Sequence, residues 1–442
     1  LQEKVDALLA ESRFDDLRIL LSEEHPSDLA DIVNHVGEDD KSTLFRLISS
    51  ELSPEVLSRV KDSTLTALLA GLDDEEISTA VDQLRSDDAA DIVAQLSEDD
   101  ASRVMDLMED EDKESLQTLL TYPEESAGGL MESEFVAVHE NVTVGEAVHE
   151  LRLRARAVEQ VQNVYAIDRA GRLVGILELW RLTISSDDHP VEPLIDREFY
   201  SVPVDMDQEE VASLAMRYDL VEVPVVDAGG ILVGRITLDD VLDVVEEEAT
   251  EDLTRMAGTT EDDVHEDSVF RVTWLRLPWL LIGLAGGIGS ALLMGRFEAQ
   301  LNQVIALAFF VPVIMAMGGS VGIQCSTVVV RSIALGEMDA KRVGERIARE
   351  FSVSLIMALI LSLLLAVIAF VLQGSWGLCL ILGIALFLSI LVAACAGTMI
   401  PILLRRMGFD PALATGPFIT TTNDVLNLLI YFVVAAQLIG RI

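Results

Sequence analysis

A chain of 442 residues with a mean hydropathy of +0.39 and a formal net charge of −43 is not one uniform globular domain, because one soluble domain does not combine such apolar and acidic character. Residues 1–130 carry 34 acidic and 10 basic side chains, residues 131–270 carry 33 and 10, and residues 271–442 carry 7 and 11. The acidic parts exclude nucleic acid as a partner, and the last part is apolar enough for a lipid bilayer.

The three cysteines, Cys325, Cys379 and Cys395, all fall in apolar stretches without the spacing of a zinc site. The sequence does not begin with a basic segment followed by an apolar one, so we expect no signal peptide. It also has no phosphate-binding loop and no hydrolytic constellation. We therefore expect neither disulfides nor zinc, and no enzymatic activity.

Residues 1–122 predict an all-α domain of short amphipathic helices. The stretch 28–40 recurs at 88–100 with identical residues at eight positions, which include Asp31-Ile32-Val33 and Asp91-Ile92-Val93. Repeated helix pairs usually stack into a superhelix.

Residues 123–240 predict an α/β domain. A strand, a glycine-containing turn and a second strand occur at 167–175 and again at 226–234. Two such units in tandem resemble a CBS pair. Residues 241–270 then predict an acidic connecting helix, with Glu246, Glu248 and Glu251 among its carboxylates.

Residues 271–442 predict an all-α transmembrane domain of five helices, because each span needs about 20 apolar residues. We expect the spans near 274–294, 304–328, 350–372, 376–402 and 413–439. The flanking basic residues set the orientation, since Lys and Arg are retained in the cytoplasm. One side has Arg271, Arg276, Arg331, Lys341, Arg342, Arg346, Arg349, Arg405 and Arg406, and the other has Arg296 and Arg441. This bias predicts a cytoplasmic N-terminus and an extracytoplasmic C-terminus.

Asp424 is the one carboxylate that lies deep in a predicted span. A charged side chain near the bilayer centre costs about 2.5 to 3.5 kcal/mol on insertion scales and usually faces a wet cavity or a partner. Helical periodicity places Pro417, Thr420, Thr421, Asn427 and Tyr431 on the same face. The second span offers a stripe of small residues that includes Gly318, Gly319 and Gly322. That stripe either lines a path for an ion or serves close helix packing.

No deep Lys, Arg or His is available to neutralise Asp424, so a cation is the simplest counter-charge. Carboxylate, hydroxyl, amide and carbonyl oxygens are hard ligands that suit Mg²⁺, Ca²⁺ or Mn²⁺. Mg²⁺ keeps several of its waters and is typically held by one or two carboxylates. A single Asp424 therefore predicts the passage of a hydrated ion.

The whole chain resembles the MgtE family of magnesium channels and transporters. The resemblance rests on the segments 126–131, 239–252, 318–324 and 410–424. It implies a homodimer in the cell (inner) membrane, with Asp424 of each protomer holding hydrated Mg²⁺ beside the second and fifth spans. It also implies closure by cytosolic Mg²⁺. The matching regulatory positions are Asp87, Asp91, Asp207, Glu209, Asp219, Asp240, Asp243, Glu248, Glu251 and Asp252.

CBS pairs often bind adenine nucleotides, so the resemblance suggests ATP as a modulator. The candidate contacts are Tyr165, Thr237 and Asp240, and a CBS pair that only dimerises is the alternative. The chain departs from the family at Ser320, where Asn is usual, and at Asn427, where a small residue is common. These departures concern pore geometry and ion preference.

Other interpretations stay open. The acidic surface also fits adaptation to high salt. The transported ion could be Mn²⁺, Co²⁺ or Ca²⁺, or the chain could be a membrane-anchored Mg²⁺ or nucleotide sensor that transports nothing. A third interpretation is a CBS-regulated transporter of an anion or an organic solute. Transport of an anion is disfavoured, because Asp424 has no basic partner.

Overall fold

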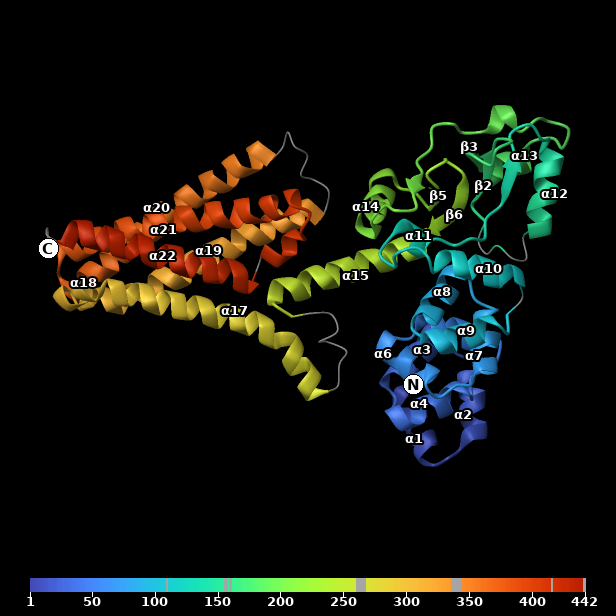
Figure 1. The fold of residues 1–442 in the computed structure, drawn as a ribbon, viewed down its shortest axis with the longest axis horizontal. Helices are drawn as coiled ribbons and strands as arrows, with labels where there is room; N and C mark the ends of the chain where they lie inside the picture. The colour runs from blue at the N-terminus through green and yellow to red at the C-terminus, as the bar shows by residue number, and fades with distance from the viewer. Residues whose placement is uncertain are drawn as a thin grey trace. The chain divides into compact units, whose positions relative to one another are not determined.

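We analysed a computed structural model that describes residues 1–108, 110–154, 158, 161–259, 268–334, 343–414 and 416–439 (Figure 1). Lys341, Arg342 and Arg441, and the segment 260–267 of the predicted connecting helix, lie outside the described residues. The chain divides into two compact units, Leu1–Val245 and Glu246–Ile442, and each is described by itself.

The first unit begins with short helices that pack around one apolar core. They are α1 (Gln2–Ala10), α2 (Phe14–Leu21), α3 (Pro26–His35), α4 (Glu38–Phe45), α5 (Ser53–Arg59), α6 (Asp62–Leu69), α7 (Asp74–Val81), α8 (Ser86–Ala94), α9 (Glu98–Met105) and α10 (Asp110–Leu119). The predicted repeat is visible as helix pairs, because α3 and α4 recur as α8 and α9. Several of these helices bury an apolar stripe, for example Leu29, Ile32 and Val33 on α3.

Two similar α/β halves follow helix α11 (Ala127–Leu130) (Figure 1). The first half contains β1 (Ala137–His139), α12 (Val144–Arg154), β2 (Asn163–Ile167), β3 (Leu173–Glu178), α13 (Leu179–Ile184) and η1 (Glu192–Leu194). The second contains β4 (Val202–Pro203), α14 (Gln208–Tyr218), β5 (Glu222–Val226) and β6 (Leu232–Thr237). In each three-stranded sheet the first two strands are parallel and the last two are antiparallel.

The two predicted turns have the same construction. Asp168 Oδ1 accepts hydrogen bonds from the amides of residues 170 and 172, and Asp227 Oδ1 accepts them from residues 229 and 231. Gly171 and Gly230 take φ of +79° and +77°, a conformation that glycine adopts without strain. The amide of Leu173 bonds to the carbonyl of Gly230, and that of Leu232 bonds to Gly171. This reciprocal pair joins the two halves.

Helix α15 (Leu238–Ala257) begins three residues earlier than the predicted connecting helix and ends much earlier. Gly258 stops it by adopting a φ of +75°.

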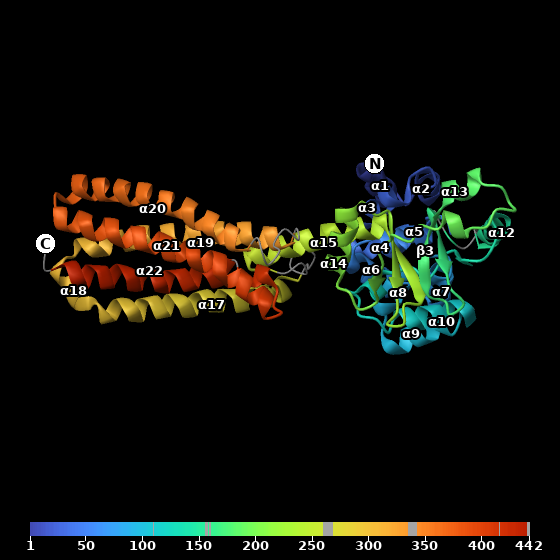
Figure 2. The same ribbon diagram turned by 90° about the horizontal axis from the view of Figure 1, so that it is seen from above.

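Within its described residues, the second unit has five helices long and apolar enough to cross a membrane, which lie side by side in both views (Figures 1 and 2). They are α17 (Val269–Arg296), α19 (Ala306–Ala334), α20 (Val343–Gln373), α21 (Trp376–Arg406) and α22 (Gly416–Leu438), with short connections at α18 (Glu298–Gln303) and η2 (Pro411–Ala414). Helix α21 contacts α19, α20 and α22. The most apolar stretch of α21 is 56% buried, whereas that of α17 is 6% buried. Helix α21 is therefore central, and α17 presents its apolar surface outward.

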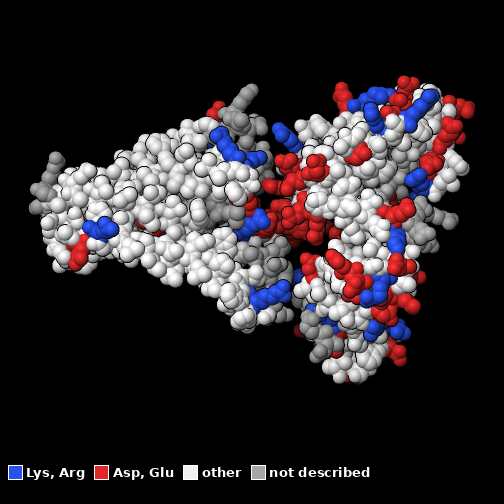
Figure 3. Space-filling view, in the orientation of Figure 1, with Lys and Arg blue, Asp and Glu red and all other residues white. Residues whose placement is uncertain are grey.

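Charge follows the same division. Figure 3 shows acidic and basic side chains crowded over the first unit and sparse over the membrane helices. The predicted fold class, a multi-domain membrane protein, is confirmed by five apolar helices alongside the helical and tandem α/β parts.

Candidate metal centres

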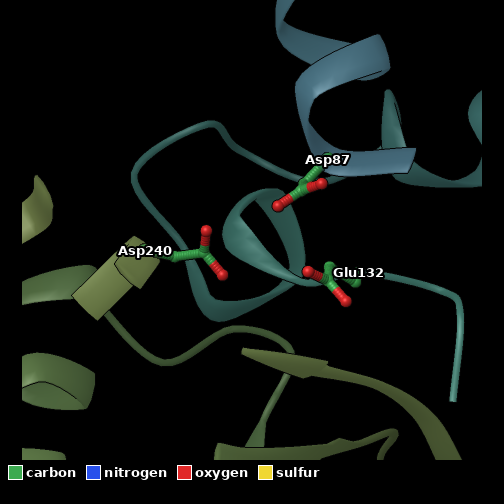
Figure 4. Close-up of side chains that lie close together, drawn as sticks. All are labelled: Asp87, Glu132 and Asp240. Carbon is green, nitrogen blue, oxygen red and sulfur yellow. The ribbon is translucent and has the colours of Figure 1, made fainter. Parts of the chain in front are cut away.

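Three carboxylates converge in the first unit. Asp87 on α8, Glu132 just after α11 and Asp240 in the first turn of α15 each offer a ligand oxygen within 4.8 Å of the other two. Figure 4 shows the three carboxyl groups directed toward one another. Of the predicted regulatory residues, the structure brings Asp87 and Asp240 together in this cluster. Glu132 was not predicted.

A guanidinium stands among these carboxylates. Arg85 Nη1 lies 2.6 Å from Glu132 Oε1, and its Nη2 lies 3.3 Å from Asp240 Oδ1. It also contacts Asp88 and Asp239 at 3.3 Å and Asp87 at 3.7 Å. Arg85 therefore has five acidic neighbours drawn from three segments of the chain.

Burial dominates the electrostatics of the cluster. It raises the pKa of Asp87, Glu132 and Asp240 above the ordinary carboxyl range, although the positive charge of Arg85 beside them acts to lower it. The Oδ1 atom of Asp87 is buried and has no hydrogen-bond partner among the described residues. The donor set is entirely oxygen, which fits Mg²⁺ or another hard cation.

A second arginine lies beneath this cluster. Arg235 on β6 is 2% exposed and bonds to Glu132 Oε2 at 2.9 Å and to Glu222 Oε1 at 2.7 Å. The hydroxyl of Tyr165 donates to Glu222 Oε2 at 3.1 Å. Tyr165, a predicted nucleotide contact, is thus fully buried within an ion network.

The other predicted nucleotide contacts bond to each other. Thr237 Oγ1 donates to Asp240 Oδ2 at 2.5 Å, and the Thr237 amide donates to the same oxygen at 3.0 Å. Asp240 is therefore shared between the predicted nucleotide contacts and the carboxylate cluster.

The remaining predicted carboxylates of the first unit are spread over three helices. Asp207 caps α14 by accepting the amide of Glu209 at 2.9 Å, and Asp219 ends that helix with a φ of +52°. Asp91 lies on α8 and Asp243 on α15, both with exposed side chains. Among the described residues, the group of carboxylates whose ligand oxygens lie within 4.8 Å of one another does not include these five.

In the second unit, Glu248, Glu251 and Asp252 lie on α15 near the loop before α22. Arg255 forms ion pairs with Glu251 and with Asp410. Burial raises the pKa of Asp252 to about 6, and the like charges of Asp410 and Glu248 add to the rise. This second acidic group combines predicted ligands with Asp410, which the prediction had only as a loop residue.

Asp424 is half-buried on α22, and no hydrogen bond or ion pair joins it to the residues that the structure describes. Thr420 Oγ1 donates to the carbonyl of Gly416 at 2.9 Å. Thr421 faces α17, where a Cβ added to Gly286 would collide with it. The predicted pore residues of α22 thus divide between different faces of the helix.

The seam between α19 and α22 is polar and tightly packed. Added Cβ atoms at Gly318 and Gly322 would collide with the carboxamides of Asn427 and Asn423, whereas one at Gly319 would meet nothing within 4 Å. Both asparagines are fully buried, and neither carboxamide has a hydrogen-bond partner among the described residues. Asn427 therefore packs against α19, and Asn423 was not predicted.

Arg85, Glu132, Arg235, Glu222 and Asn423 are the site residues that the sequence alone did not indicate. Four of them are charged residues of a strongly acidic chain, and Glu222 begins the otherwise apolar strand β5. For Asn423 a signal existed, because it lies four residues before Asn427 on one helical face.

Comparison with known protein families shows which family the chain belongs to. The family model described as a divalent cation transporter matches residues 311–434, the MgtE intracellular N domain matches 24–125, and CBS domains match 127–184 and 191–247. A magnesium transporter MgtE of Bacillus subtilis is 37% identical over 326 residues, which are 74% of this chain and 72% of the relative. The chain belongs to the MgtE family.

Another relative and two solved structures agree with this placement. The magnesium transporter MgtE of Thermus thermophilus is 37% identical over 338 residues, covering 75% of this chain and 74% of that one. A crystal structure of the cytosolic domain of the Mg²⁺ channel MgtE in complex with ATP aligns with a TM-score of 0.52 and 34% identity, covering 55% of this chain and all of that one. The soluble part of a magnesium transporter aligns with a TM-score of 0.50 and 26% identity, over 56% of this chain and 98% of that one.

Proposed function

We propose that this MgtE-family protein conducts hydrated Mg²⁺ across the cell membrane through a homodimeric pore at Asp424. The observation that carries the proposal is a half-buried carboxylate in a membrane helix with no cationic partner among the described residues. Such a group needs a counter-ion or water. One carboxylate and several retained waters match the way Mg²⁺ is held, and a second protomer would supply a second carboxylate.

We further propose that cytosolic Mg²⁺ closes the pore by binding the acidic residues of the N-terminal helices, the CBS pair and α15. The cluster of Asp87, Glu132 and Asp240 supports this, because it joins three segments and retains an unpartnered buried oxygen. Bridging by a divalent ion would strengthen the contact between these segments, and chelation would weaken it. The proposed orientation puts these residues in the cytoplasm, since Arg276, Arg346 and Arg405 all lie at span ends on that side.

ATP binding to the CBS pair is a separate proposal. It rests on the solved relative in complex with ATP and on the adjacent Thr237 and Asp240. Tyr165 would have to exchange its bond to Glu222 for the ligand. A CBS pair that only dimerises would show no saturable change in Tyr fluorescence when ATP is added.

The transport proposal is tested with protein in liposomes that contain a fluorescent Mg²⁺ indicator. We expect Mg²⁺ entry that exceeds entry of Ca²⁺ and Mn²⁺ and that stops when Mg²⁺ is raised on the side facing the acidic domains. Folded protein without Mg²⁺ entry would favour the non-transporting sensor, and equal entry of Mn²⁺ or Co²⁺ would remove the Mg²⁺ preference.

A further inference from the structure

Arg85 lies where helix α8, the segment after α11 and the start of α15 meet. Its guanidinium contacts Glu132 at 2.6 Å and Asp240 at 3.3 Å, and both are distant from it in the sequence. A guanidinium is always charged and presents five N–H donors in a fixed fork, so one side chain can bond several carboxylates at once. The side chain of Arg85 thus places a permanent positive charge among the carboxylates of the cluster.

Arg85 does not satisfy all the carboxylate oxygens of the cluster. Asp87 is 6% exposed and its Oδ1 has no hydrogen-bond partner among the described residues, while its carboxyl group is directed toward those of Glu132 and Asp240 (Figure 4). A buried carboxylate oxygen without a partner is unfavourable, and a hard divalent cation is the ligand that would satisfy it. Arg85 contacts five carboxylates, and Arg235 bonds to one of them, Glu132.

We propose that Arg85 is a tethered cation that holds α8 against the segment after α11 and the start of α15 when no divalent ion is bound, and that it competes with a divalent ion for the same carboxylates. The first half rests on the ion pairs of Arg85 with Glu132 and Asp240. The second half rests on the regulatory function proposed above. The positive charge thereby sets the Mg²⁺ concentration at which the cluster fills.

The two halves predict opposite effects of removing the charge. Without Arg85 the metal-free contact weakens, because the carboxylates repel one another. The same change strengthens binding of a divalent ion, because a like charge within hydrogen-bond distance of its ligands has gone. A merely structural role would give only the first effect.

The test follows the backbone amide of Ser133, which donates to Ser86 Oγ at 2.8 Å and reports whether α8 stays on the segment after α11. Hydrogen exchange of the full chain in nanodiscs would be measured on peptides around residue 133, first with EDTA and then across a Mg²⁺ titration. The variants are Arg85→Gln and the charge-conserving Arg85→Lys. The matched control is Arg46→Gln, which breaks an exposed ion pair with Glu76 on the same group of helices.

In EDTA, we expect Arg85→Gln to exchange at Ser133 roughly tenfold faster than wild type or more, since it loses a partly buried ionic network. The Mg²⁺ concentration that gives half of the full protection at Ser133 should be about tenfold lower in Arg85→Gln than in wild type. Arg85→Lys should keep the wild-type midpoint, and Arg46→Gln should match wild type throughout. Peptides from β2 and α22 report whether each variant is folded.

If folded Arg85→Gln exchanges at Ser133 as slowly as wild type in EDTA, Arg85 does not hold α8 in place. If its Mg²⁺ midpoint equals that of wild type, Arg85 does not compete with the divalent ion. If wild-type exchange at Ser133 ignores Mg²⁺, both the regulatory function and the competition fail. The comparison in EDTA would still show whether Arg85 holds α8 in place.

Discussion

Gly318 of α19 lies directly against the carboxamide of Asn427 on α22, with no room between them for a Cβ. One turn further along, Gly322 and Asn423 repeat the arrangement. These two contacts set how closely α19 and α22 approach, and α22 carries Asp424. The distance between the helices therefore depends on glycine at both positions.

Substituting Gly318 should separate the two helices. We expect Gly318→Val to destabilise the protein by about 1 to 3 kcal/mol, because overpacking forces neighbouring side chains and backbone to shift. It should also reduce Mg²⁺ flux in liposomes. Gly287→Val on α17 is the matched control, since nothing lies within 4 Å of an added Cβ there. The double variant Gly318→Ala with Asn427→Ala should be more stable than Gly318→Ala alone. Equal loss of stability in Gly318→Val and Gly287→Val would contradict the close packing of α19 against α22.

Arg235 should be the most sensitive ionic position in the first unit. Arg235→Met leaves Glu132 and Glu222 buried without their partner, and breaking a buried pair in this way costs about 3 to 5 kcal/mol. Thermal unfolding in detergent would show a much lower midpoint than for Arg217→Met, an exposed arginine on α14. Equal midpoints for the two variants would mean that the network does not stabilise the fold.

Asp252 predicts a pH dependence of stability. Burial and the nearby Asp410 and Glu248 raise its pKa to about 6, whereas an unfolded Asp titrates near about 4. The folded state therefore holds a proton that the unfolded state loses, so stability from this group falls as pH rises from about 4 to 6. In Mg²⁺-free buffer, Asp252→Asn should stabilise the protein above pH 6 and lose this advantage below about pH 4. A gain that is the same at pH 4 and pH 8 would exclude the proposed ionisation.

Much of the fold followed from patterns local in sequence. The repeat at 28–40 and 88–100 predicted helix pairs, and the two aspartate–glycine turns predicted the halves of the α/β part. Apolar length alone predicted five spans, although α22 begins at Gly416 because Pro411–Ala414 forms a separate 3-10 turn.

The site residues that were missed depend on contacts between distant segments. Arg85 meets Glu132 and Asp240 across 47 and 155 residues, and no periodicity indicates such a meeting. On α22 the helical period placed Asn427 near Asp424, but it could not say which side of the helix faces α19. The structure shows Asn427 buried in that seam while Asp424 is half-exposed.

The most direct test of the proposed function is Mg²⁺ entry into liposomes containing wild-type protein, Asp424→Asn or Asp424→Ala. Glu298→Gln is the control, because it removes an exposed carboxylate from α18 in the same unit. With equal amounts of folded protein, we expect both Asp424 variants to fall to the rate of empty liposomes and Glu298→Gln to retain wild-type entry. Wild-type entry through folded Asp424→Ala would contradict the central claim.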